Sequence, residues 1–167
     1  MLTRTLAAVG TATLLMSTLF AGSAIAADTP EEVVEAQPIT GPYVPGPVGE
    51  TSSQAISVLP FDFEFQMCCS LDSRQFQPPG RGNAGKACVE LWGTKSDDPS
   101  WRSQKVKVIM WDEDGIDGKK GPTVDFKLDQ PRKYCWTSLT VAHPHHFEIQ
   151  KPWGPAQLWG KGKATGS

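Results

Sequence analysis

The chain has 167 residues with 16 basic and 18 acidic side chains, a formal net charge of −2 with neutral histidines. This balance gives no support to nucleic-acid binding, which usually shows a basic stripe on the protein. The length suits one domain and is too short for two domains with separate cores.

The first 26 residues have the pattern of a secretory signal peptide. One positive charge, Arg4, precedes an apolar stretch that ends near Phe20, and small residues follow. Ala24 and Ala26 stand in the A-x-A positions of a cleavage site. The apolar stretch is short for a membrane span. We therefore expect cleavage after Ala26, a secreted, extracellular protein and no membrane span in the mature chain.

Residues 27–57 are expected to form a flexible, acidic leader that contains proline. They include five acidic and five proline residues and no lysine or arginine, a composition that disfavours a regular helix. A passive spacer is one interpretation. The alternative is a partner-binding segment, because apolar side chains in an extended chain suit a groove or a sheet edge. The side chains expected to make these contacts are Val33, Val34, Ile39, Tyr43 and Val44.

Residues 58–167 are predicted to form an all-β domain. The stretch 61–67 alternates strictly between apolar and polar residues, the pattern of a half-buried strand. Further strands are expected at 87–94, 104–111, 123–129, 133–141 and 146–150. Short strands separated by turn-rich loops favour a small antiparallel sandwich or barrel. No strand is predicted in the tail after Lys151. Trp101, Trp153 and Trp159 are candidates for exposed aromatic contacts, and local packing is the favoured interpretation of each ring taken alone.

All four cysteines lie in the β domain, and an even number in an exported chain predicts two disulfides. A bond between Cys68 and Cys69 is disfavoured, because adjacent residues on a strand point to opposite faces. Two connectivities remain open. Either Cys68 pairs with Cys88 and Cys69 with Cys135, or Cys68 pairs with Cys135 and Cys69 with Cys88.

An acidic loop follows the strand expected at 104–111. Within residues 106–128, VKVIMWDEDGIDGKKGPTVDFKL resembles the strand–acidic loop–strand stretch of calcium-binding C2 domains. The resemblance implies that Asp112, Asp114 and Asp117 supply oxygen ligands to calcium. A solvated turn rich in Asp and Gly is the alternative interpretation.

One histidine cluster, His143, His145 and His146, surrounds Pro144. Imidazoles two residues apart can share a strand face, so they are candidates for binding zinc or copper, or for sensing mild acid. An exposed loop cluster without a metal is the alternative, because Pro144 disturbs regular strand pairing. The sequence contains neither G-x-S-x-G nor H-E-x-x-H, and no motif requires a cofactor. We therefore expect a non-enzymatic protein.

The order of signal peptide, extended leader and two-disulfide β domain resembles the small adaptor subunits of the umbrella toxin particles that actinobacteria secrete. This resemblance of architecture implies that the leader lies in a cleft of one partner while the β domain holds another. Two alternative functions remain open. One is a secreted protease or hydrolase inhibitor with a reactive loop at residues 75–85, and the other is a calcium-dependent carbohydrate- or surface-binding β-sandwich.

Overall fold

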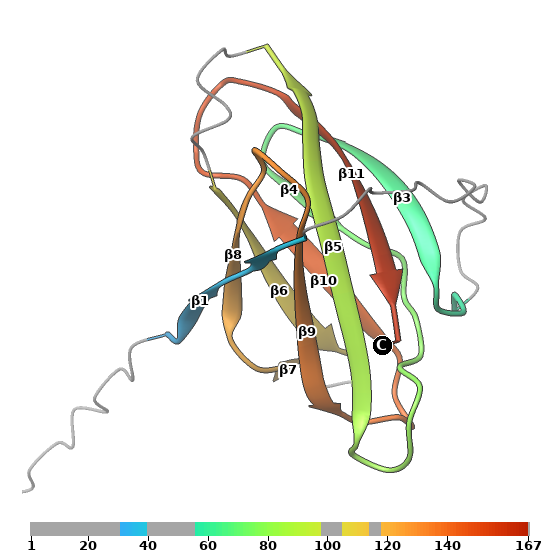
Figure 1. Ribbon diagram of the computed structural model, residues 1–167. Coiled ribbons are helices and arrows are strands. Elements are labelled where there is room, and N and C mark those ends of the chain that lie inside the picture. The colour runs from blue at the N-terminus through green and yellow to red at the C-terminus, as the bar shows by residue number, and fades with distance from the viewer. Residues whose placement is uncertain (1–30, 40–55, 98–104, 114–117, 167) are drawn as a thin grey trace, which may run out of the picture. The chain divides into compact units, whose positions relative to one another are not determined.

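The computed structural model describes residues 31–39, 56–97, 105–113 and 118–166. Every regular element in these ranges is a strand, and the strands form two sheets (Figure 1). The all-β sandwich expected from the sequence is thereby confirmed, with one parallel strand pair among otherwise antiparallel pairs. None of the described segments forms a helix long and apolar enough to cross a membrane. The expected signal peptide, 1–26, lies outside the described residues.

The strand order defines the two sheets. The first sheet runs in the order β1 (Val33–Glu35), β8 (Thr123–Lys127), β6 (Lys105–Asp112), β10 (His145–Gln150) and β4 (Ser70–Asp72), and β7 (Gly118–Lys119) also pairs with β6. The second sheet runs in the order β2 (Gln37–Pro38), β9 (Arg132–Leu139), β5 (Gly85–Ser96), β11 (Leu158–Thr165) and β3 (Phe61–Met67). Their apolar side chains form one buried cluster.

The chain passes from one sheet to the other at both edges of the sandwich. Strands β1 and β2 are edge strands of different sheets and are separated by the buried Ala36. Strands β3 and β4 are the opposite edge strands, and only Cys68 and Cys69 separate them. At each crossing, an edge strand of one sheet continues directly into an edge strand of the other sheet. The second crossing places the two adjacent cysteines at a corner of the sandwich.

Part of the predicted leader belongs to the β domain. Strand β1 pairs with β8, Val34 packs against the core, and the Ile39 amide donates to the Pro131 carbonyl. The sheets therefore begin before the expected boundary at residues 57 and 58. A short edge strand tolerates the nearby prolines because one side of its backbone needs no partner. The remaining predicted contacts, Tyr43 and Val44, lie outside the described residues.

Strand β11 was not predicted, although it is an interior strand of its sheet. Gly160 pairs with Phe65, and Gly162 pairs with Phe63 of β3. A Cβ atom at either glycine would overlap the phenylalanine ring beside it. The small residues of β11 therefore make room for the large residues of β3.

The disulfide pairing differs from both expected connectivities. Cys88 of β5 bonds to Cys135 of β9, and their Cα atoms are 3.9 Å apart. The two residues are direct partners in the register of these antiparallel strands, so strand pairing selects this bond. Cys68 and Cys69 are exposed free thiols. The described structure therefore contains one disulfide instead of the expected two.

Candidate functional site

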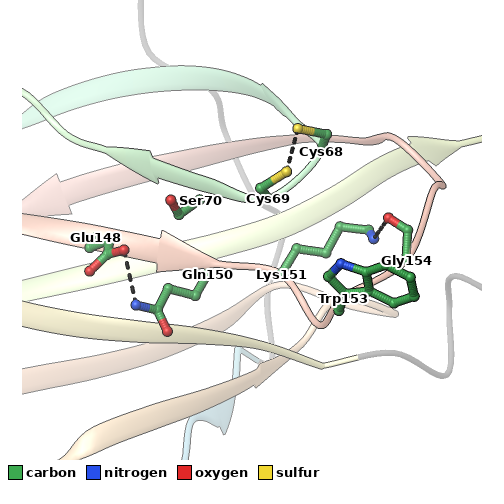
Figure 2. A pocket seen from close by; sticks show the side chains of 8 residues that line it. All are labelled: Cys68, Cys69, Ser70, Glu148, Gln150, Lys151, Trp153 and Gly154. Carbon is green, nitrogen blue, oxygen red and sulfur yellow. Dashed lines mark hydrogen bonds between the residues drawn. The ribbon is translucent and has the colours of Figure 1, made fainter.

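A pocket of about 330 Å³ lies where the turn between β3 and β4 meets the end of β10 (Figure 2). We call it the corner pocket. Its lining comprises Cys68, Cys69, Ser70, Glu148, Gln150, Lys151, Trp153 and Gly154. It combines two thiols, a lysine ammonium and an indole ring, so it can offer both polar and apolar contacts to a binding partner.

Lys151 shapes the loop that carries Trp153. Its side chain is largely buried, and its ammonium group donates to the carbonyls of Pro152 and Gly154 at 3.1 and 3.2 Å. Its backbone amide donates to the Cys69 carbonyl at 2.8 Å. A buried cation is costly unless such acceptors surround it, so these bonds favour one loop conformation. Figure 2 shows the Lys151–Gly154 bond beside the indole ring.

Trp153 itself is fully exposed, at 102% of its reference area. Its ring therefore remains hydrated although the loop beneath it is held by Lys151. Tryptophan is enriched among the residues that dominate protein interfaces. The sequence offered both exposure and local packing for this ring, and the structure shows it exposed. No sequence signal revealed the role of Lys151.

The two thiols of the corner pocket point toward each other, with 2.6 Å between their sulfur atoms (Figure 2). The hydrogen bond to Cys68 is the main reason why the pKa of Cys69 is raised. Burial and the charge of Cys68 raise this pKa further, and Lys151 opposes them. The Cys69 thiol therefore loses its proton less readily than an ordinary cysteine thiol.

An apolar groove of about 200 Å³ follows the same edge of the sandwich, between β3 and β4. Its apolar lining consists of Phe61, Phe63, Leu71, Phe147 and Ile149. The guanidinium of Arg74 lies 4.5 Å from the centre of the Phe61 ring. This is a cation–π contact, and the groove is also lined by the polar residues Glu64, Asp72 and Ser73.

The acidic loop is only partly described. Asp112 is buried, and its carboxylate lies 3.0 Å from the Lys120 ammonium and 3.1 Å from Nδ1 of His143. Asp114 and Asp117 lie outside the described residues. Within the part that the structure describes, no three His, Cys, Asp or Glu side chains are grouped to hold a metal ion. Calcium binding by this loop stays a prediction.

The histidines divide between two environments. His143 and His145 both approach Asp112, the latter at 3.7 Å, so residues two apart share a face as expected. The Lys120 ammonium pairs with the Asp112 carboxylate and so supplies the positive charge that a metal ion would otherwise provide there. His146 instead stacks on Trp111 and pairs with Glu113. We see in this arrangement a buried ion-pair cluster and no set of three metal ligands.

We expect the cluster to make stability fall in mild acid. Burial lowers the pKa of His145 below 6.5, although the His143 carbonyl and Asp112 oppose this. Burial alone would raise the pKa of Asp112, but Lys120 and the two histidines outweigh it and lower this pKa below 3.8. Below about pH 6.5, His145 is protonated more fully in the unfolded chain than in the folded chain, so the free energy of unfolding falls as the pH drops. Asp112 adds to the loss only below about pH 4.

Thermal denaturation at several pH values tests this expectation. The melting temperature should fall as the pH drops from about 7.5 to 5. His145→Asn should flatten that dependence, because its amide can still donate to the His143 carbonyl without titrating. The control His146→Gln alters a histidine outside the Asp112 cluster and should keep the slope. An unchanged slope in His145→Asn would contradict the assignment.

The loop proposed for an inhibitor is folded against the domain. Phe76 is fully buried and exchanges two backbone hydrogen bonds with His145. The Gly82 carbonyl accepts from Val141, and the Arg81 carbonyl accepts from Ala84. Residues 79–84 are exposed, but these internal bonds hold them in a turn. A reactive loop at residues 75–85 stays a prediction.

The chain was also compared with known proteins. No protein-family model matches the sequence, and comparison with the curated proteins gives no match.

Proposed function

We propose that this protein is a secreted, non-enzymatic interaction module that binds an extracellular protein partner through the corner pocket. The observation that carries the proposal is the full exposure of Trp153 on a loop held by Lys151. Because the Lys151 bonds hold the loop backbone, little backbone freedom is lost when a partner binds there. Covering the indole ring with a partner also removes a large apolar surface from water.

An adaptor needs a second contact surface, and we propose that residues 40–55 supply it. Val34 packs against the core and is less suited to an external contact than the sequence suggests. Val33, on the same edge strand, is 45% exposed. Tyr43 and Val44 are the remaining apolar candidates of the leader. A module with these two contacts would join two larger subunits, as the resemblance to umbrella particle adaptors implies.

The leader must be tested without damage to the sandwich. Deletion of residues 27–55 would remove β1 and β2 together with the buried Ala36. Replacement of residues 40–55 by a Gly/Ser segment of equal length keeps both strands. A loss of partner binding in this variant can therefore be assigned to residues 40–55 and not to damage of the sandwich.

The test is affinity capture from culture supernatant of the native host, with the tagged mature protein. Wild type should recover defined partners, and Trp153→Ala should lose at least one of them. Val58→Ala is the control, because Val58 is 84% exposed yet lies outside the corner pocket. It should recover all partners, whereas the leader replacement should lose a different one. Equal recovery by wild type and Trp153→Ala, or no partner at all, would refute the proposal.

A further inference from the structure

The corner turn brings together two side chains that a regular strand would separate. Cys68 and Cys69 lie between β3 and β4, where the chain leaves one sheet and enters the other. Their sulfur atoms are 2.6 Å apart, which is about half an ångström longer than a disulfide bond. The objection that adjacent cysteines point to opposite faces applies to strands and does not apply to this turn.

The rest of the chain offers these thiols no competing partner. The sequence contains four cysteines, and the other two are bonded to each other between β5 and β9. Cys68 and Cys69 are both exposed, so a reagent in solution reaches them. Within one molecule, each thiol can therefore form a disulfide only with its neighbour unless the Cys88–Cys135 bond opens.

We propose that Cys68 and Cys69 are a modification site, a dithiol that a disulfide-type oxidant converts into a vicinal disulfide. One thiolate attacks a sulfur of the oxidant, forms a mixed disulfide and releases the first oxidant thiol. The second cysteine then attacks the sulfur of the first and releases the second oxidant thiol. Two thiols and one oxidant disulfide thus become one new disulfide and two thiols. Two electrons and two protons pass to the oxidant.

Glutathione is the probe that tests this site. The mature protein is incubated at low concentration with oxidised and then with reduced glutathione, and free thiols are alkylated with N-ethylmaleimide after each step. Peptide mass spectrometry follows residues 68 and 69. After oxidation their peptide should carry no label and be lighter than the dithiol by two hydrogens. After mild reduction it should carry two labels, while Cys88 and Cys135 remain bonded.

The single variants provide matched controls. Cys68→Ser and Cys69→Ser each leave one thiol without its neighbour and should each collect one glutathione adduct in the oxidising step. The wild type should not retain that adduct, because its second cysteine displaces it. A retained adduct, a disulfide-linked dimer or two maleimide labels on the oxidised wild type would overturn the proposal. The measurement does not depend on any partner, so it stands apart from the proposed binding function.

Discussion

Gly160→Val is expected to lower the free energy of unfolding by about 3 kcal/mol, a large overpacking effect. A side chain at this position would overlap the Phe65 ring and lie 2.7 Å from the Trp92 carbonyl oxygen. Strand β11 is hydrogen-bonded to β3 on one side and to β5 on the other. The Trp92 backbone cannot retreat without breaking that pairing. Chemical denaturation of both proteins measures the difference.

Lys161→Val is the matched control on the same strand. Lys161 pairs with the exposed Glu64 at 2.8 Å, an ion pair of small expected value. Its replacement by the same β-branched residue should change the free energy of unfolding by less than about 1 kcal/mol. If both variants are equally stable, Gly160 does not face Phe65 as the register requires.

Removal of the Cys88–Cys135 disulfide by paired alanine substitutions should also cost about 4 kcal/mol. The bond joins residues 47 positions apart, so its loss releases a long loop in the unfolded chain and increases the entropy of that state. Both cysteines also lie at paired positions of adjacent strands. The free energy of unfolding under non-reducing conditions is the quantity to measure.

The corresponding alanine pair at Cys68 and Cys69 is its control. Both thiols are exposed, and a bond between neighbours would close almost no loop. We expect a change below about 1 kcal/mol. A larger loss here than at Cys88 and Cys135 would contradict the assignment of the structural disulfide.

Alternation of apolar and polar residues predicted much of the fold. The strand expected at 61–67 is β3 with the same bounds, and each of the other five expected strands corresponds to an observed one. This agreement has a simple cause: one face of each strand meets the core, and the period of two survives in the sequence. The expected bounds of the other five strands differ from the observed bounds by no more than two residues.

Strand β11 escaped prediction because its core-facing positions include Gly160, Gly162 and Ala164. Glycine is depleted in strands, and these residues contribute through the space that they leave for Phe65 and Phe63. That complementarity exists only between two segments far apart in the chain. The sequence of either one alone does not display it.

The corner pocket was only partly predictable for the same reason. Trp153 stood out as an aromatic residue in a Gly- and Pro-containing segment, but the burial of Lys151 has no local signature. Cys68 and Cys69 were assigned to long-range disulfides, because a strand geometry was assumed where the chain turns between sheets. The pairing of Cys88 with Cys135 depends on the register of β5 and β9, which spacing between cysteines does not determine.

The most direct test of the binding role is calorimetric titration of a captured partner against wild type, Trp153→Ala and Val58→Ala. We predict that Trp153→Ala raises Kd about 30-fold, the equivalent of about 2 kcal/mol for a hot-spot residue. Val58→Ala should change Kd by less than about threefold. An unchanged Kd for Trp153→Ala, with both variants folded, would contradict the assignment of the corner pocket as the partner-binding surface.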